Sequence, residues 1–243
     1  MRVVPASANV RREWCNRVEA EYRSAAITQH LTLWLIQAGA PPDLIADGLR
    51  IVGDELAHAQ LSHEVYTAAD GDAGPRIDRG QLELPRRPSE PVERDLARWG
   101  VEIFCLGETV AVPLFRRLRE LSTVDAARRA LDRVLRDEVR HRQFGWDLLD
   151  WLMTHPAADS LRELIRGELP RMFAGLEHSY GAPNAARQDP AAISDDDRAW
   201  GLAPAAEYAD ILARTFTREF EPRFRDRDID AKAAWDERLI HID

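Results

Sequence analysis

One short pattern occurs twice in this chain, as Gly53-Asp54-Glu55-Leu56-Ala57-His58 and as Arg136-Asp137-Glu138-Val139-Arg140-His141. Both copies read Asp-Glu-x-x-His. On a helix, a spacing of three residues places the Glu and the His about one turn apart on one face, so both can reach the same metal ion. The second copy is in phase with an apolar series, namely Leu131, Val134, Leu135, Leu148 and Leu152. The spacing therefore predicts acid–imidazole pairs inside a helical core, where a carboxylate must be paired, protonated or bound to metal.

Two further carboxylates complete a predicted dimetal site. Glu21 shares a helical face with Trp14, Val18, Ala25 and Thr28, and Glu108 shares one with Val101, Phe104, Ala111 and Phe115. Residues equidistant from the turn of an antiparallel helical hairpin lie at one level. The midpoints between each Glu and its motif fall near residues 39 and 124, both at turns, so the ligands lie ~25 Å from either turn. Glu102 misses this level by about three residues on the same reckoning.

The chain is predicted to be helical almost throughout, because no run of alternating β-branched residues indicates a sheet. Helices are expected at residues 7–38, 43–70, 91–121, 125–154 and 157–180, the last one bent at Pro170. Residues 181–203 are typical of a loop, and an amphipathic segment follows at 204–220.

The segment at residues 71–91, GDAGPRIDRGQLELPRRPSEP, has little helical pattern and several prolines and glycines. Antiparallel neighbours in a bundle need only ~2–8 linking residues, whereas about twenty extended residues span the length of a bundle. We therefore predict an all-α fold in which two antiparallel hairpins are joined by one long crossover. The four-helix bundle is expected to occupy residues 1–155, with a helical C-terminal extension packed on it at residues 156–243.

Composition limits the possible functions. The 243 residues are 45% hydrophobic and carry a formal net charge of −9, which disfavours nucleic-acid binding. No apolar run is long enough to span a membrane or to form a signal peptide. The two cysteines, Cys15 and Cys105, form no CxxC motif, so we expect a cytoplasmic protein.

With these motifs, residues 11–154 resemble the ferritin-like di-iron carboxylate proteins, which include bacterioferritin, rubrerythrin and the di-iron monooxygenases. Glu on two helices and Glu-x-x-His on two others mark that class. The resemblance implies two iron ions, or manganese or a mixed Mn/Fe pair, bound by Glu21, Glu55, His58, Glu108, Glu138 and His141. It further implies that Asp54 hydrogen-bonds His141 and that Asp137 hydrogen-bonds His58.

The function expected from this resemblance is that of a di-iron oxygenase or oxidase that activates O₂ to oxidise a small organic substrate. Glu21 and Glu108 are expected to act as the mobile carboxylates at the metals. A separate electron donor is implied, since no flavin or nucleotide fingerprint is present, and a homodimer is expected. The alternatives are a ferroxidase or iron-handling protein, a peroxide scavenger, and a metal-free helical interaction module. The substrate and the choice between O₂ and peroxide stay open.

Pro113 and Gly107 are expected to distort the helix at the level of Glu108 and to open room for O₂ or substrate. For the other polar or aromatic residues near the predicted site, we favour an ordinary structural role. We expect packing for Cys105, Tyr22 and the aromatic stripe from Tyr208 to Phe220, and a solvated helix end for His63 and Glu64.

Overall fold

The computed structural model describes residues 4–180 and 193–241, and every regular element within these residues is a helix. The long elements are α1 (Ala8–Gln37), α2 (Pro42–Ala68), α3 (Val92–Trp99), η2 (Gly100–Glu108), α4 (Thr109–Leu121), α5 (Asp125–Met153) and α6 (Ala158–Tyr180). The shorter ones are η1 (Arg79–Gln81), α8 (Asp195–Ala199), α9 (Ala205–Thr215), η4 (Phe216–Phe220), α10 (Glu221–Arg225), α11 (Ala231–Glu237) and η5 (Arg238–His241). The predicted all-α class is confirmed. Within the described ranges, no helix is long and apolar enough to cross a membrane.

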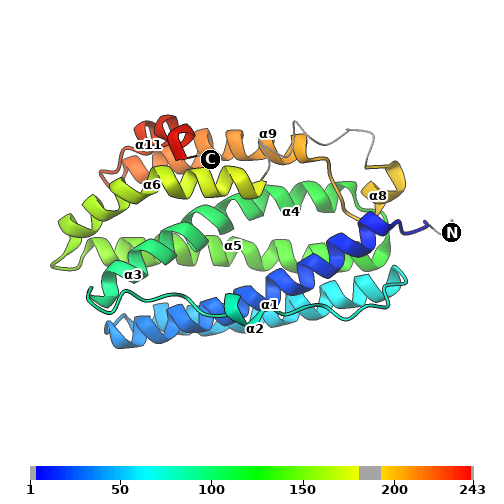
Figure 1. Ribbon diagram of the computed structural model, residues 1–243, viewed down its shortest axis with the longest axis horizontal. Helices are drawn as coiled ribbons and strands as arrows, with labels where there is room; N and C mark the ends of the chain where they lie inside the picture. The colour runs from blue at the N-terminus through cyan, green and yellow to red at the C-terminus, as the bar shows by residue number, and fades with distance from the viewer. Residues whose placement is uncertain (1–3, 181–192, 242–243) are drawn as a thin grey trace.

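Helices α1 and α2 form an antiparallel hairpin along one side of the molecule (Figure 1). The Ser7 side chain caps α1 by accepting hydrogen bonds from the next turn, and Gly39 makes the turn to α2 with a positive φ of 71°. Helix α2 begins one residue earlier than predicted, at Pro42, because a proline fits the first helical position, where no N–H bond is needed. Asp43 lies in its first turn rather than at its cap.

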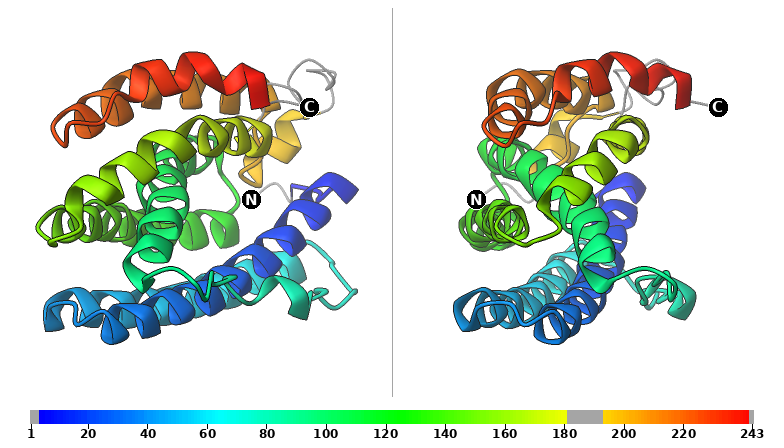
Figure 2. Two further views of the ribbon diagram at one scale, coloured as in Figure 1. Left: turned by 60° about the vertical axis from the view of Figure 1, so that its left-hand side comes forward. Right: turned by 90° about the vertical axis from the view of Figure 1, so that its left-hand side faces the viewer.

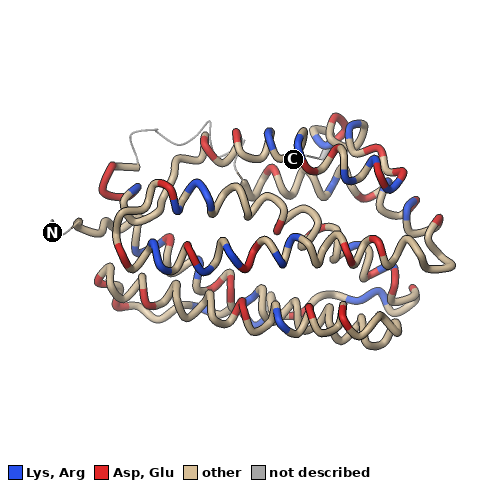
Figure 3. Tube along the Cα trace, turned by 180° about the vertical axis from the view of Figure 1, so that it is seen from behind, with Lys and Arg blue, Asp and Glu red and all other residues tan. Residues whose placement is uncertain are grey.

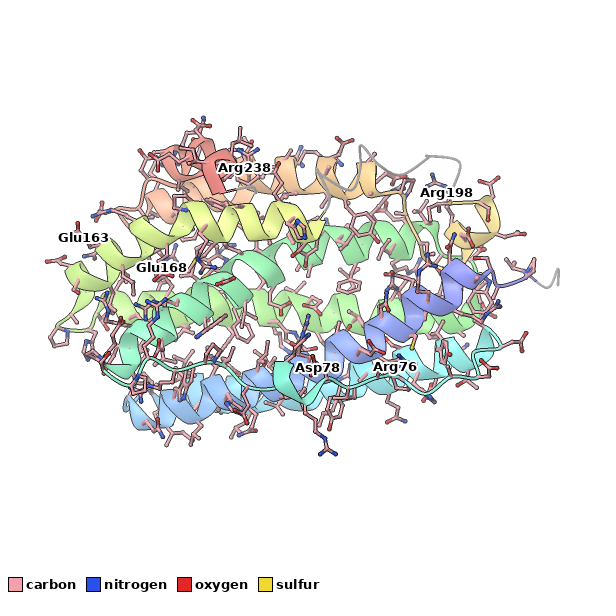
Figure 4. All side chains as sticks on the ribbon, in the orientation of Figure 1. Arg76, Asp78, Glu163, Glu168, Arg198 and Arg238 are labelled. Carbon is pink, nitrogen blue, oxygen red and sulfur yellow. The ribbon has the colours of Figure 1, made fainter. Side chains whose placement is uncertain are left out.

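The linker from α2 to α3 runs back along α1 (Figure 1), so α2 and the α3–η2–α4 segment point in the same direction. Its ties to α1 are polar: the Arg76 backbone N–H donates to Glu19 at 2.7 Å, and Arg23 donates to Gln81 at 2.9 Å. Figure 4 shows Arg76 and Asp78 on the linker where it passes α1. This is the path predicted for residues 71–91.

The segment from α3 to α4 is continuous but not uniform. Gly100–Glu108 forms a π-helix, and Pro113 lies inside α4. A π-helical turn is wider than an α-helical one and is frequent at functional sites. The predicted distortion of this helix is therefore present, and it ends at the residue expected to be a metal ligand.

Helix α6 and the C-terminal helices cover the α3–η2–α4/α5 pair on the side away from α1 and α2 (Figure 2). Aromatic packing joins these layers: Trp146 of α5 meets Phe224 edge-on with centroids 5.1 Å apart, and Phe216 and Phe220 pack on Phe173 of α6. The aromatic stripe is thus core packing, as predicted. Of the expected 181–203 loop, residues 181–192 lie outside the described residues.

The prediction of a loop at residues 195–199 is wrong, because α8 forms there. A reciprocal capping box explains it: Ser194 accepts from the Asp197 backbone N–H, and the Asp197 side chain accepts from the Ser194 backbone. Such a box satisfies two helix-end donors within one turn and supports even a short helix. Elsewhere, acidic and basic side chains interleave along the helices (Figure 3).

Candidate metal centre

Six side chains converge from both hairpins in the middle of the helical core. They are Glu21 on α1, Glu55 and His58 on α2, Glu108 at the end of η2, and Glu138 and His141 on α5. The ligand atoms of Glu21, Glu55 and His58 lie within 4.8 Å of one another, and so do those of Glu55, Glu108 and His141. These two groups share Glu55 and contain five of the six predicted residues, and the sixth, Glu138, contacts both imidazoles.

Two carboxylates lie between the two imidazoles. The Nδ1 atom of His58 is 3.6 Å from Glu55 Oε2 and 3.9 Å from Glu138 Oε1. The Nδ1 atom of His141 is 3.4 Å from Glu55 Oε1 and 3.5 Å from Glu138 Oε2. Two donors that are each about 2.1 Å from one ion lie roughly 3–4 Å apart. Glu55 and Glu138 are therefore placed to reach two ions at once.

Several of these atoms form no hydrogen bond although they are buried. They are Glu55 Oε2, Glu138 Oε2, and the Nδ1 atoms of His58 and His141. Buried polar atoms without a partner are rare in folded proteins, and each one costs free energy. All four belong to the same cluster, so cations between them would satisfy them together. The donor set, imidazole nitrogen and carboxylate oxygen, fits iron or manganese.

The outward nitrogen of each imidazole meets an Asp from the other motif. His58 Nε2 lies 3.2 Å from Asp137 Oδ2, and His141 Nε2 lies 3.5 Å from Asp54 Oδ2. The resemblance implied a hydrogen bond in each of these pairs: His58 and Asp137 are within hydrogen-bond distance, whereas His141 and Asp54 are in contact without one. A carboxylate at the outer nitrogen fixes the ring orientation and directs Nδ1 inward.

Two arginines hold both of these Asp side chains, and the sequence analysis missed them. Arg133 donates to Asp54 at 3.0 Å and also to Asp137. Arg140 donates to Asp54 at 2.9 Å and to Asp137 at 2.8 Å. The signal was available, because Arg133 and Arg140 lie four residues before and three residues after Asp137 on one helix.

The buried groups of this site have strongly shifted pKa values. Burial raises the pKa of Glu21 and of Glu108 well above the ordinary range, and repulsion from Glu55 and Glu138 adds to it. Burial opposes the charge of His141, yet its contacts with Asp54 and Glu138 raise its pKa to about 10. Glu138 is also buried, but its close contacts with Glu108 and His141 lower its pKa to about 2.

Four residues considered for a role in the site lie elsewhere. Tyr22 is 42% exposed, and His63 and Glu64 are exposed on α2. Cys105 is fully buried, with Sγ 3.2 Å from the Gly145 carbonyl oxygen. These positions agree with the ordinary structural roles favoured for them, although Tyr22 faces solvent rather than a neighbouring helix.

Two other residues near the ligands were not predicted. Ser24 donates from Oγ to Glu55 Oε1 at 3.0 Å. Tyr180, at the end of α6, is within electrostatic reach of the centre: burial raises the pKa of its phenol, and the charges of Glu108 and Glu138 raise it further. Nothing in the motif pattern indicated Tyr180, because α6 belongs to the part of the chain that the resemblance did not cover.

Comparison of the chain with protein-family models, with curated proteins and with solved structures gives no match. The geometry of the cluster is therefore the basis for a functional assignment.

Proposed function

We propose that this chain is a di-iron oxidoreductase of the ferritin-like type, which uses O₂ to oxidise a small organic molecule. One observation carries the proposal: Glu55 and Glu138 each lie 3.4–3.9 Å from the Nδ1 atoms of both imidazoles, in a buried site where four inward atoms form no hydrogen bond. The order of two hairpins joined by a long linker supports it, because that class uses this arrangement.

One ion would be held by Glu21 and His58 and the other by Glu108 and His141, with Glu55 and Glu138 reaching both. Iron bound there would supply the electrons that activate O₂. Two imidazoles among hard oxygen donors suit Fe(II), although manganese or a mixed pair takes similar ligands. Four carboxylates offset two divalent charges, so the loaded site is neutral enough for a buried position.

The surrounding residues orient and charge this site. Asp54 and Asp137 hold the outer imidazole nitrogens, and the two arginines hold those carboxylates in turn. The raised pKa values of Glu21 and Glu108 favour their protonated forms without metal, and ion binding would displace those protons. Because each of these two carboxylates serves one ion only, we assign them the mobile roles. A separate electron donor and a homodimeric state belong to the same proposal.

Iron oxidation, iron handling or peroxide scavenging is the alternative use of such a centre. A storage protein needs only the bundle, whereas α6 and α9–α11 add a further layer over α4 and α5 (Figure 2). That additional layer favours an organic substrate. Gel filtration separates the two functions, since a storage cage elutes as a very large particle.

The test is an anaerobic Fe(II) titration of the metal-free chain, followed by exposure to air. We expect saturation at two irons per chain and new absorption in the near-ultraviolet and visible range. Glu55→Ala and Glu138→Ala should lose stoichiometric binding. Glu102→Gln is the matched control, because Glu102 lies on the same helical segment as Glu108 but pairs with Arg171 at 3.1 Å. Absence of stoichiometric binding of both Fe(II) and Mn(II) would contradict the proposal.

A further inference from the structure

A cavity of about 680 Å³ lies between α4 and α9. Small-molecule sites typically enclose ~300–1,000 Å³. The two helices run antiparallel here: Arg117 Nε donates to Glu207 at 2.7 Å near one end, whereas Thr109 and Thr215 both line the other end. The ion pair thus lies at one end of the lining, and the cavity follows the two facing helix surfaces toward Thr109 and Thr215.

Five arginines and four carboxylates line this cavity, so its formal charge is +1. The carboxylates are Glu120, Glu207, Asp210 and Glu219, of which Glu207 pairs with Arg117 and Glu219 with Arg142. Among the described residues, Arg116 and Arg218 have no hydrogen-bond or ion-pair partner, and Arg214 donates only to the backbone of its own helix, at 3.1 Å. These three guanidinium groups are the candidate anion-binding groups of the cavity.

The same cavity has an apolar wall. Val112 and Ile211 are only 4% and 6% exposed, and Pro113 lies beside them. Free guanidinium groups beside aliphatic side chains fit a molecule that has one acidic group and an apolar body. A planar guanidinium binds carboxylate or phosphate through paired, charge-assisted hydrogen bonds.

Two residues that line the inner end of the cavity are sequence neighbours of candidate metal ligands. Thr109 directly follows the ligand Glu108, and Arg142 directly follows the ligand His141; both line the cavity. Pro113 has no N–H, so it cannot donate the usual helical bond to the Thr109 carbonyl. Arg142 Nε is buried without a hydrogen bond, although the same guanidinium lies 3.6 Å from Glu219. This Nε donor is therefore the group at this end that a bound molecule would satisfy.

We propose that this cavity binds a small organic anion with an apolar body, whose acidic group is held by Arg116, Arg214 and Arg218, and that this is the substrate class of the dimetal centre. The second half rests on the proposed function. The binding half does not, since it needs only the arginines and the apolar wall of the metal-free chain.

Calorimetry on the full metal-free chain tests the binding half with four probes: octanoate, octyl phosphate, 1-octanol and octylamine. We expect an anion to bind at least tenfold more tightly than the alcohol, no binding of the amine, and the stronger anion to identify the acidic group. The double variant Arg116→Glu/Arg218→Glu should weaken anion binding at least tenfold. Both side chains are exposed, so the fold should tolerate the change.

Arg129→Glu is the matched control, because Arg129 is exposed on α5 and takes no part in the cavity. Equal binding of octanol and octanoate, absence of anion binding, or an unchanged affinity in the double variant would each overturn the binding half.

Co(II) bound to the chain tests the substrate half through its visible absorption. Saturation with the preferred anion should change the Co(II) spectrum in the wild type and in Arg129→Glu, but not in the double variant at the same concentration. A spectrum unaffected by a bound anion would overturn the substrate half and leave a separate anion site. Failure of the chain to bind Co(II), Fe(II) or Mn(II) would instead contradict the proposed function, while calorimetry would still decide the binding half.

Discussion

His58 and His141 each divide their two ring nitrogens between opposite surroundings. The Nδ1 atom faces carboxylates of the cluster, and the Nε2 atom faces an Asp that is itself held by two guanidinium groups. Contacts with His141 and then with Arg140 lower the pKa of Asp54, and Arg133 and His58 lower that of Asp137 against its burial. Both Asp side chains therefore stay anionic and fix the orientation of the rings.

Asp137→Asn should weaken metal binding by roughly 10–100-fold, because the neutral amide no longer favours the His58 tautomer whose Nδ1 lone pair points inward. Mn(II) calorimetry measures the change, and circular dichroism checks the fold. Asp132→Asn is the control: it removes a carboxylate from the same helix that is 53% exposed and bound to Arg119. Equal affinities for the two variants would show that Asp137 does not position His58.

Metal binding should release protons. Near pH 7 the metal-free site is protonated at His141, whose pKa is about 10, and the raised pKa values of Glu21 and Glu108 add protons. Ligands bind metal in their deprotonated forms, so affinity should rise with pH between 6 and 8. Mn(II) calorimetry in two buffers of different ionisation enthalpy measures the release. Binding heats that are independent of buffer, with an affinity independent of pH, would contradict it.

The ligands could be predicted from the sequence because helical periodicity alone sets their direction and depth. Glu102 illustrates the discrimination: it fails the level test and in the structure pairs with Arg171 instead. Tyr180 and Ser24 could not be found in this way. The position of Tyr180 depends on how α6 packs, and the contact of Ser24 depends on the rotamer of its side chain. Neither feature produces a periodic pattern in the sequence.

At the scale of elements, the spacing of residues predicts a helix at residues 91–121 but does not predict which type of helical turn forms at each position. A distortion at the level of Glu108 was predicted there from Pro113 and Gly107, and the π-helix at Gly100–Glu108 includes that level but extends about two turns before it. Its position follows from contact with α5. A Cβ atom at Gly145 would lie 2.6 Å from the Phe104 backbone carbon, so only glycine permits this approach.

Gly145→Ala should lower the free energy of unfolding by about 1–3 kcal/mol, because α5 and η2 must move apart. Gly167→Ala is the matched control in α6, where an added Cβ meets nothing within 4 Å. It should instead stabilise the chain by about 0.5–1 kcal/mol, through a lower entropy of the unfolded state. Urea unfolding measures both. Equal stability of the two variants would refute the close approach of α5 and η2.

At the scale of the whole molecule, the C-terminal part closes back on the start of α1. Trp14 Nε1 donates to the Trp200 carbonyl at 3.0 Å, and Arg17 donates to the Gly201 carbonyl at 3.1 Å. At the other end of the chain, Arg238 donates to Glu177 of α6 at 2.8 Å and fixes the last helical turn there. Figure 4 labels Arg238 above α6. The Trp14–Trp200 and Arg17–Gly201 contacts join residues more than 180 positions apart, so no local sequence pattern predicts them.

Such closure leads us to expect one cooperative unfolding transition, and metal should shift it as a whole. The ligands come from both hairpins, so an ion that binds only the folded chain ties four helical segments together. At a free Mn(II) concentration a thousandfold above Kd, the stabilisation is about 4 kcal/mol. For a chain of this size, that corresponds to a rise in Tm of roughly 8–16 °C.

Differential scanning calorimetry of the chain with and without Mn(II) measures this shift, and far-ultraviolet circular dichroism and tryptophan fluorescence should give the same midpoint. Glu55→Gln serves as the comparison, because it removes the carboxylate shared by both ligand groups. Its Tm should respond little to Mn(II), and without metal it should be at least as stable as the wild type, since one buried acid is gone. A wild-type Tm that does not respond to Mn(II) would mean that the clustered acids hold protons rather than metal. A shift confined to one of the two optical probes would mean that the hairpins and the C-terminal helices unfold separately.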